Sequence, residues 1–282
     1  MIEYRNTTVF NSNCEAIVNT VNCIGVMGAG LALEFSLRYP TMLEEYKKDC
    51  ENKLVNIGKV NIYKDENQII LNFPTKYHWK FPSKIEWVEK GLEFIVQNYK
   101  KWNVKSIAIP PLGCSNGGLN FEKEVKPLIE KMLSNLDVLV VVCIDPGYPE
   151  GKEKEMLESF KKDDLEKICF SLKITGKAKE GLILNQALVN RFYEIKEIPG
   201  VGIKSYEKIY SMYIYVESSI YVNKASHLVV SYYDMNYGMI MKTKMNIDRV
   251  DTGGHIIQKG EVLKVYVGEK KSKIHYIAVK KD

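Results

Sequence analysis

The feature that most limits how this chain can fold is an alternation, over about its first 145 residues, of short apolar runs with amphipathic helical stretches. Such alternation is typical of a layered α/β domain. We therefore expect strands at 16–21, 59–63, 68–73, 106–109 and 138–144, and helices that begin at Gly28, Lys84 and Phe121. Ser83 and Glu86 have the spacing of a capping box at the start of the second helix.

The pattern changes after a break made by Pro146, Gly147 and Pro149. A charged helical stretch follows at 152–167. The chain then becomes rich in Tyr and Lys, with β-like runs at 211–222, 227–233, 239–245, 262–267 and 274–279. We therefore expect an α/β domain at 1–150, a linker helix at 151–170, and a smaller, mostly β (α+β) domain at 171–282.

Charge and cysteine content narrow the function classes. The net charge of +5 comes from the second half, since residues 1–160 carry −2 and residues 161–282 carry +7. A basic half suits an acidic partner such as nucleic acid, although many Lys-rich surfaces only confer solubility. The six cysteines form no C-x-x-C pair, so neither a disulfide framework nor a metal site is indicated. With no apolar run long enough for a membrane span and no signal peptide, we expect a cytoplasmic protein.

Two glycine-rich loops are the most informative motifs. Residues 18–32 (VNTVNCIGVMGAGLA) and residues 109–119 (IPPLGCSNGGL) each read as a strand, a glycine turn and a helix start. Backbone N–H groups and a helix N-terminus at such a turn bind anions well. Either loop alone could be a simple tight turn. Together they favour a ligand that carries phosphate.

These loops carry a family resemblance. The first resembles the first ligand loop of macrodomains and the second resembles their second, while residues 72–79 (NFPTKYHW) resemble a strand end of the DarG branch. That branch includes the DNA ADP-ribosyl glycohydrolase antitoxins, which pair with DarT toxins, and the eukaryotic terminal ADP-ribose glycohydrolases. The resemblance covers residues 1 to about 145. It implies a three-layer macrodomain with a mixed central sheet, ADP-ribose in the cleft, and neither metal nor cofactor.

Site residues follow from the same resemblance, position by position. Lys76 matches the lysine that this branch uses at the reacting carbon, where an amine acts as nucleophile or stabilises charge once burial lowers its pKa. Asn22 is implied to hydrogen-bond the distal ribose. The implied substrate-binding positions are Asn22, Val26, Gly28, Gly30, Gly113, Cys114, Ser115, Asn116, Gly117, Gly118 and His78.

The sequence departs from the family pattern at three places. Thr8 stands where many macrodomains have an acidic residue for adenine, and Ser115 replaces a usual glycine. Gly117 stands where the eukaryotic relatives have an acidic general acid/base. Proton transfer would therefore depend on water, the substrate or Lys76. His78 and Trp79 could line the cleft, stack on a base, or belong to the core.

The resemblance implies removal of ADP-ribose from thymine in DNA, with the chain acting as the antitoxin of a DarT-like ADP-ribosyltransferase. Two other functions remain open. A reader would bind ADP-ribose without turnover, and a related hydrolase would cleave ADP-ribose esters of proteins or small molecules. The C-terminal half could instead carry the main function through a toxin or nucleic acid.

One short motif in that half resembles part of a DNA-binding module. Residues 198–209 (IPGVGIKSYEKI) open like the hairpin of helix-hairpin-helix modules, which bind DNA. Glycine N–H groups at a helix start could hold a phosphate there, with Lys204 and Lys208 adding charge. A Pro-Gly turn that joins a helix to a strand accounts for the pattern equally well.

Overall fold

The computed structural model describes residues 1–65 and 68–214 in full, and beyond them the backbone of the strands within 218–224, 227–234, 238–246, 262–270 and 273–280. The chain divides into two compact units, Met1–Gly147 and Tyr148–Asp282. The boundary falls three residues before the one expected at 150. Each unit is described by itself below.

The first unit is built on a six-stranded mixed sheet with strand order β1-β6-β5-β2-β4-β3. Five strands are parallel, and only β3, at one edge, runs antiparallel to its neighbour β4. The strands are β1 (Ile2–Asn6), β2 (Ala16–Asn22), β3 (Asn61–Lys64), β4 (Ile69–Lys76), β5 (Ser106–Ile109) and β6 (Leu139–Ile144). The sheet is therefore mixed, as the family resemblance implied.

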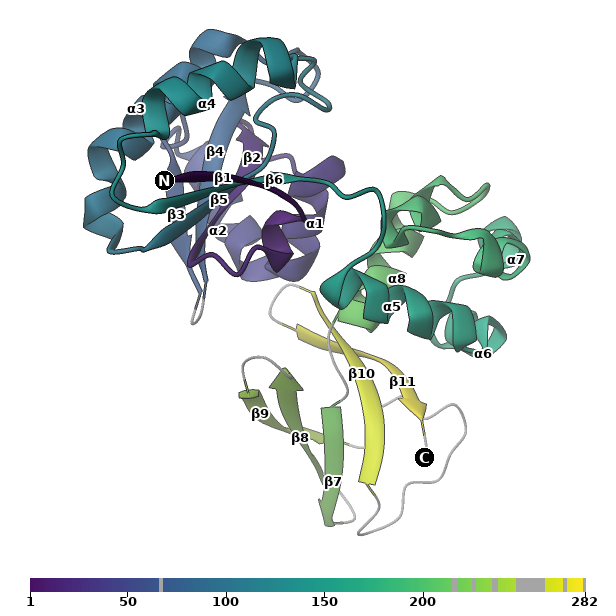
Figure 1. Ribbon diagram of the computed structural model, residues 1–282. Coiled ribbons are helices and arrows are strands. Elements are labelled where there is room, and N and C mark those ends of the chain that lie inside the picture. Colours follow the sequence, from purple (N-terminus) through teal and green to yellow (C-terminus); the bar gives the residue numbers. More distant parts are fainter. Residues whose placement is uncertain are drawn as a thin grey trace. The chain divides into compact units, whose positions relative to one another are not determined.

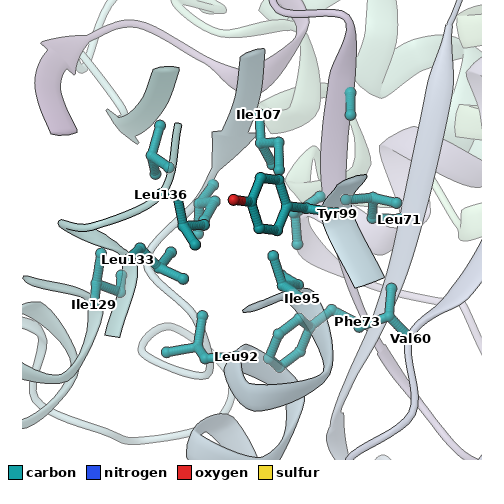
Figure 2. Close-up of a cluster of buried hydrophobic side chains, with 14 of the residues drawn as sticks. Val60, Leu71, Phe73, Leu92, Ile95, Tyr99, Ile107, Ile129, Leu133 and Leu136 are labelled. Carbon is teal, nitrogen blue, oxygen red and sulfur yellow. The ribbon is translucent and has the colours of Figure 1, made fainter. Parts of the chain in front are cut away.

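Helices cover both faces of this sheet because successive strand residues point to opposite sides. On one face, α3 (Ile85–Trp102) and α4 (Lys126–Leu133) pack on a core that includes Leu71, Phe73 and Ile107 (Figures 1 and 2). On the other, α1 (Gly30–Arg38) and α2 (Pro40–Glu51) pack on the alternate residues, such as Ile17 and Ile70. The result is a three-layer α/β arrangement with two separate cores.

Several local expectations were wrong in detail. The first helix begins at Gly30 and not at Gly28, and Pro40 starts α2 as a separate helix. The capping box is absent, because Lys84 is the N-cap of α3 and the buried Ser83 hydroxyl has no hydrogen-bond partner. The helix from Phe121 begins with a π-helical turn (Phe121–Val125) that runs into α4.

The second unit begins with helices, the first two of which lie where the sequence predicted a linker helix. Residues 151–170 form α5 (Gly151–Lys162) and most of α6 (Leu165–Ser171), and α7 (Gly176–Asn185) and α8 (Ile203–Ile214) follow. A buried aromatic cluster joins α5 and α8, in which the Phe192 ring centroid lies 6.0 Å from that of Phe160 and 5.7 Å from that of Tyr210. These two helices therefore share one core.

Five antiparallel strands complete the second unit, in the order β11-β10-β7-β8-β9. They are β7 (Ser218–Lys224), β8 (His227–Asp234), β9 (Gly238–Asn246), β10 (Val262–Lys270) and β11 (Lys273–Lys280). The expected run at 211–222 is divided between the end of α8 and β7. None of the helices among the described residues is long and apolar enough to cross a membrane.

Candidate ligand-binding cleft

The candidate site lies where three neighbouring parallel strands end. Strands β5, β2 and β4 are adjacent in the sheet, and their carboxyl ends point to one edge. Ligands of open α/β sheets bind outside this edge, because the loops that leave the strands converge there. The loops at 23–29, 77–84 and 110–118 form the walls of the site.

A register shift brings the two key polar residues side by side. Along β2 and β4 each residue has the expected partner up to Val21 and Pro74, and a bulge then pairs Asn22 with Lys76. Bulges often re-aim side chains beside active sites. Hydrogen bonding between these two chain segments continues beyond the strands, because Cys23 N donates to Tyr77 O at 3.1 Å. The positions of Asn22 and Lys76 are therefore fixed by the sheet itself.

Asn22 organises the first glycine loop. Its Oδ1 accepts from the main-chain N–H groups of Ile24 and Val26 at 3.1 and 3.3 Å, and its Nδ2 donates to Val26 O at 2.5 Å. The hydroxyl of Tyr46, in α2, donates to Asn22 O. Burial of that hydroxyl raises the pKa of Tyr46, so it stays protonated and remains a donor.

Lys76 joins the other two loops. Its Nζ donates to Asn116 O in the second glycine loop and to Trp79 O, at 3.3 Å, in the loop that follows β4. Partial burial lowers the pKa of Lys76 below that of an ordinary lysine. Both acceptors are neutral carbonyls, so neither supplies a negative charge that would oppose this shift.

The second glycine loop is closed so tightly that only glycine fits at Gly117. A Cβ there would lie 2.2 Å from Gly113 O and 2.3 Å from Ser83 Oγ. The loop is held by bonds from Leu119 N to Gly113 O and from Ser83 N to Gly117 O, of 3.1 and 2.9 Å. Ser83 thus packs under the loop and supports it.

The two glycine loops approach each other at Gly30 and Asn116. A Cβ on Gly30, whose φ is +55°, would lie 3.0 Å from Asn116 Nδ2. Between the loops is a cavity of about 990 Å³, large enough for a dinucleotide-sized ligand. Its lining includes Thr20–Asn22, Val26, Gly28–Ala32, Thr75, Lys76, Trp79–Pro82, Pro111 and Gly113–Gly118.

Comparison with known proteins agrees with this arrangement. The Macro domain family model matches residues 18–127, which span both glycine loops and Lys76. This part of the chain is a macro domain.

Relatives of the macro domain carry a consistent name. The chain is 42% identical over 152 residues to the DNA ADP-ribosyl glycohydrolase of Mycobacterium tuberculosis, covering 52% of this chain and 43% of that protein. The corresponding Thermus aquaticus protein is 41% identical over 150 residues, with 52% and 41% covered. A Thermosipho africanus fusion of a DNA ADP-ribosyl transferase with a DNA ADP-ribosyl glycohydrolase is 35% identical over 155 residues, with 48% and 40% covered.

Among solved structures, the macrodomain of Thermus aquaticus DarG is 42% identical, with a TM-score of 0.49, and the match covers 51% of this chain and 98% of that one. Thermosipho africanus DarTG in complex with ADP-ribose is 34% identical, with a TM-score of 0.49 and coverage of 53% and 43%. The chain thus spans less than half the length of the curated relatives that it matches.

Most of the residues expected at the site lie together in the macro domain's cavity. Lys76 and every predicted substrate-binding residue except His78 are in its lining. His78 lies beside the lining, with its ring stacked on Trp79 at 5.7 Å and its Nδ1 accepting from Lys80 N at 3.2 Å. Their roles toward a ligand stay predictions.

The sequence analysis missed part of the lining. Lys80, Phe81 and Pro82 line the cavity, and Ser83 supports the second loop, yet none of these residues belongs to a glycine motif. Their position directly after Lys76 was the only available signal, because the loop that leaves β4 must cross the same sheet edge. Thr8, noted for its departure from the family pattern, is not in the lining.

Cys114 is in the lining but is a poor nucleophile. Burial, and secondarily the charge of Glu124, raises the pKa of the Cys114 thiol to about 11, so the thiolate is scarce at neutral pH. Among the described residues, no group of three or more His, Cys, Asp or Glu side chains is placed to hold a metal ion. Lys76 is therefore the strongest candidate for a chemical role in the cavity.

Proposed function

We propose that this macro domain is an ADP-ribosyl glycohydrolase that releases ADP-ribose from DNA modified on thymine. The observation that carries the proposal is the place of Lys76. It projects from the end of β4 between the two glycine loops, with a lowered pKa and with Asn22 as its cross-strand neighbour. A protein that only binds ADP-ribose would need the loops but not this amine.

In the proposed reaction the bond between the distal ribose carbon and the thymine nitrogen breaks. The base leaves with the bonding electrons and takes up a proton, and water adds to the sugar carbon with loss of its own proton. The glycine loops hold the diphosphate and Asn22 holds the ribose. Lys76 acts at the reacting carbon. Much of the acceleration then comes from positioning the sugar and the water.

The names of the relatives support DNA as the carrier of the modification. Two of them are named DNA ADP-ribosyl glycohydrolases, and the third is named as a fusion of this enzyme with a DNA ADP-ribosyl transferase. By extension, we propose that a DarT-like transferase is the opposing partner and that this chain acts as its antitoxin. Co-expression with such a transferase tests this role, since the chain should restore growth and Lys76→Ala should not.

The central experiment measures ADP-ribose release from a thymine-modified oligonucleotide by wild type and by Lys76→Ala. We expect Lys76→Ala to bind free ADP-ribose but to lose about 30- to 1,000-fold in rate, or ~2 to 4 kcal/mol of transition-state stabilisation. Lys105→Ala is the matched control, because Lys105 is exposed just before the start of β5, at the opposite end of that strand.

Lys76→Arg separates two roles of the amine. Arginine keeps the charge but does not deprotonate at accessible pH. If the neutral amine reacts, Lys76→Arg is as inactive as Lys76→Ala, and the wild-type rate rises with pH around a pKa below that of ordinary lysine. If the charge stabilises the transition state, Lys76→Arg retains activity. Hydrolysis by Lys76→Ala at the wild-type rate contradicts the proposal.

A further inference from the structure

The loop that leaves the cavity after Lys76 exposes an unusual amount of aromatic surface. Tyr77, Trp79 and Phe81 are 61%, 48% and 60% exposed. A single exposed aromatic residue needs no explanation, but three at alternate positions form a patch. We refer to residues 77–84 as the aromatic rim.

The rings of the aromatic rim hold one another in place. His78 stacks on Trp79 with ring centroids 5.7 Å apart and planes inclined by 21°, and it lies 5.4 Å from the Phe81 ring. The bond from Lys80 N to His78 Nδ1 and the bond from Phe81 N to His78 O, of 3.1 Å, fix the turn. A binding partner therefore meets a preformed surface, which lowers the entropic cost of binding.

Lysine side chains are interleaved with these rings. Lys80 Nζ lies 5.2 Å from the centroid of Trp79, and Lys84 Nζ lies 5.1 Å from that of Trp87 at the start of α3. Aromatic faces alternating with cations suit single-stranded nucleic acid, because unpaired bases stack on the rings while the phosphates contact the lysines.

The aromatic rim is continuous with the cavity. Trp79, Lys80 and Phe81 line the cavity together with Lys76, while Tyr77 and Lys84 are exposed beside them in the chain and are not in the lining. If the ribose carbon lies at Lys76, the group attached to it must leave the cavity across one of its walls. The aromatic rim is one of the two walls that Lys76 contacts, through the bond to Trp79 O, and the other is the second glycine loop, which is the proposed diphosphate site.

We propose that the aromatic rim binds the nucleotides that flank the modified base in single-stranded DNA. Trp79 and Phe81 stack on bases, and Lys80 and Lys84 contact the adjacent phosphates. This inference rests on the proposed function and adds a subsite for the strand beyond the ADP-ribosylated nucleotide. It predicts that an oligonucleotide is a better substrate than the modified nucleoside alone.

The test compares two substrates, ADP-ribosyl-thymidine and a single-stranded 9-mer that carries the same modification, with the full-length chain. We expect wild type to have a higher kcat/KM on the 9-mer. We call the kcat/KM on the 9-mer divided by that on ADP-ribosyl-thymidine the ratio. Trp79→Ala should reduce this ratio by roughly 5- to 150-fold, which is the change expected from losing one base–aromatic stacking interaction. Because the ratio is taken within one variant, any effect of Trp79 on the cavity itself cancels.

Two further variants test whether the effect depends on an aromatic ring at position 79. Phe170→Ala removes an aromatic side chain that is 74% exposed in the second unit and should leave the ratio unchanged. Trp79→Tyr should restore most of the ratio, since tyrosine also stacks. An equal kcat/KM on both substrates in wild type, or a ratio that Trp79→Ala does not change, overturns the aromatic rim as a DNA subsite and leaves the proposed function standing.

Two further outcomes separate this proposal from its alternatives. If neither substrate is hydrolysed, the proposed function fails, and binding of the unmodified 9-mer then tests whether the aromatic rim binds single-stranded DNA. Weaker binding by Trp79→Ala than by wild type supports this proposal, and equal binding overturns it. If an ADP-ribosylated peptide shows the same length benefit and loses it in Trp79→Ala, the aromatic rim binds polypeptide and the DNA assignment is overturned.

Discussion

Replacing Gly117 with alanine should damage ligand binding far more than the loss of one hydrogen atom suggests. The new methyl group would lie 2.2 Å from Gly113 O, whereas ordinary contact begins near 3.4 Å, so the loop must open by about 1 Å. A second atom, Ser83 Oγ, would lie only 2.3 Å from the same methyl group. If the opening costs one or two hydrogen bonds to the diphosphate, affinity falls by about 3 kcal/mol, or ~150-fold in Kd.

Titration calorimetry with ADP-ribose measures this loss, and a thermal melt shows whether the fold survives. Gly28→Ala is the comparison in the first loop, because the nearest atom to its added methyl group is Val26 Cγ1 at 3.8 Å, an ordinary contact. We expect a much smaller loss from Gly28→Ala. A folded Gly117→Ala protein that binds ADP-ribose as tightly as wild type would refute the close-packed loop as the diphosphate site.

Three other changes test separate parts of the chain. Gly28→Glu should abolish ADP-ribose binding, measured by calorimetry, because a carboxylate would then face the ligand's phosphates; unchanged binding would move the site elsewhere. Gly91→Ala should lower stability by about 2 kcal/mol and Tm by roughly 4–8 °C despite the better helix propensity of alanine, since its Cβ would lie 2.1 Å from Phe73 Cζ; an unchanged or higher Tm would contradict this packing. Lys204→Glu should weaken salt-dependent DNA binding by the whole chain in a fluorescence titration, whereas no change would favour a protein partner for the second unit. Lys208 is the poorer probe of DNA contact, because its Nζ already donates to Leu172 O at 2.7 Å.

The fold of the first unit could be predicted from sequence where a short-range pattern determines it. The strand at 106–109 has the expected bounds, and α3 begins one residue after Lys84. The sequence pattern failed to predict the local structure where tertiary contacts determine it. Ser83 has the spacing of a cap, yet its N–H bonds to Gly117 O and its side chain packs under that loop.

The helices of the second unit show the same limit. Tyr-rich segments favour strands in isolation, but Tyr206, Tyr210 and Tyr213 are buried on one side of α8, where the last two pack on Phe192. The charged stretch at 152–167 is likewise two helices. Asp164 caps the second of these by accepting from Glu166 N and Lys167 N.

The candidate site was more predictable than its surroundings. Either glycine motif alone could be a tight turn, but two such motifs after different strands predicted loops that lie together, and both of them line the cavity. The aromatic rim carries no such motif, since exposed Trp and Phe residues resemble core residues in a sequence. The pairing of Asn22 with Lys76 depends on a bulge, which only the register of the sheet reveals.

The order of strands in the first sheet has a consequence for folding. Among the described strands, the edge strand β1 pairs with β6 alone, with Ile2 opposite Val140, so the first strand of this unit to be synthesised has no partner until nearly the whole unit has been made. Closing so long a loop is slow, and such contacts form late. During synthesis the edges of β1 and β5 that pair with β6 must therefore stay unpaired until β6 has been made, while β2, β4 and the glycine loops can assemble from nearer neighbours. A nascent chain halted before residue 139 would already contain all three loops that form the walls of the cleft but would have an open sheet edge, which is a surface prone to aggregation.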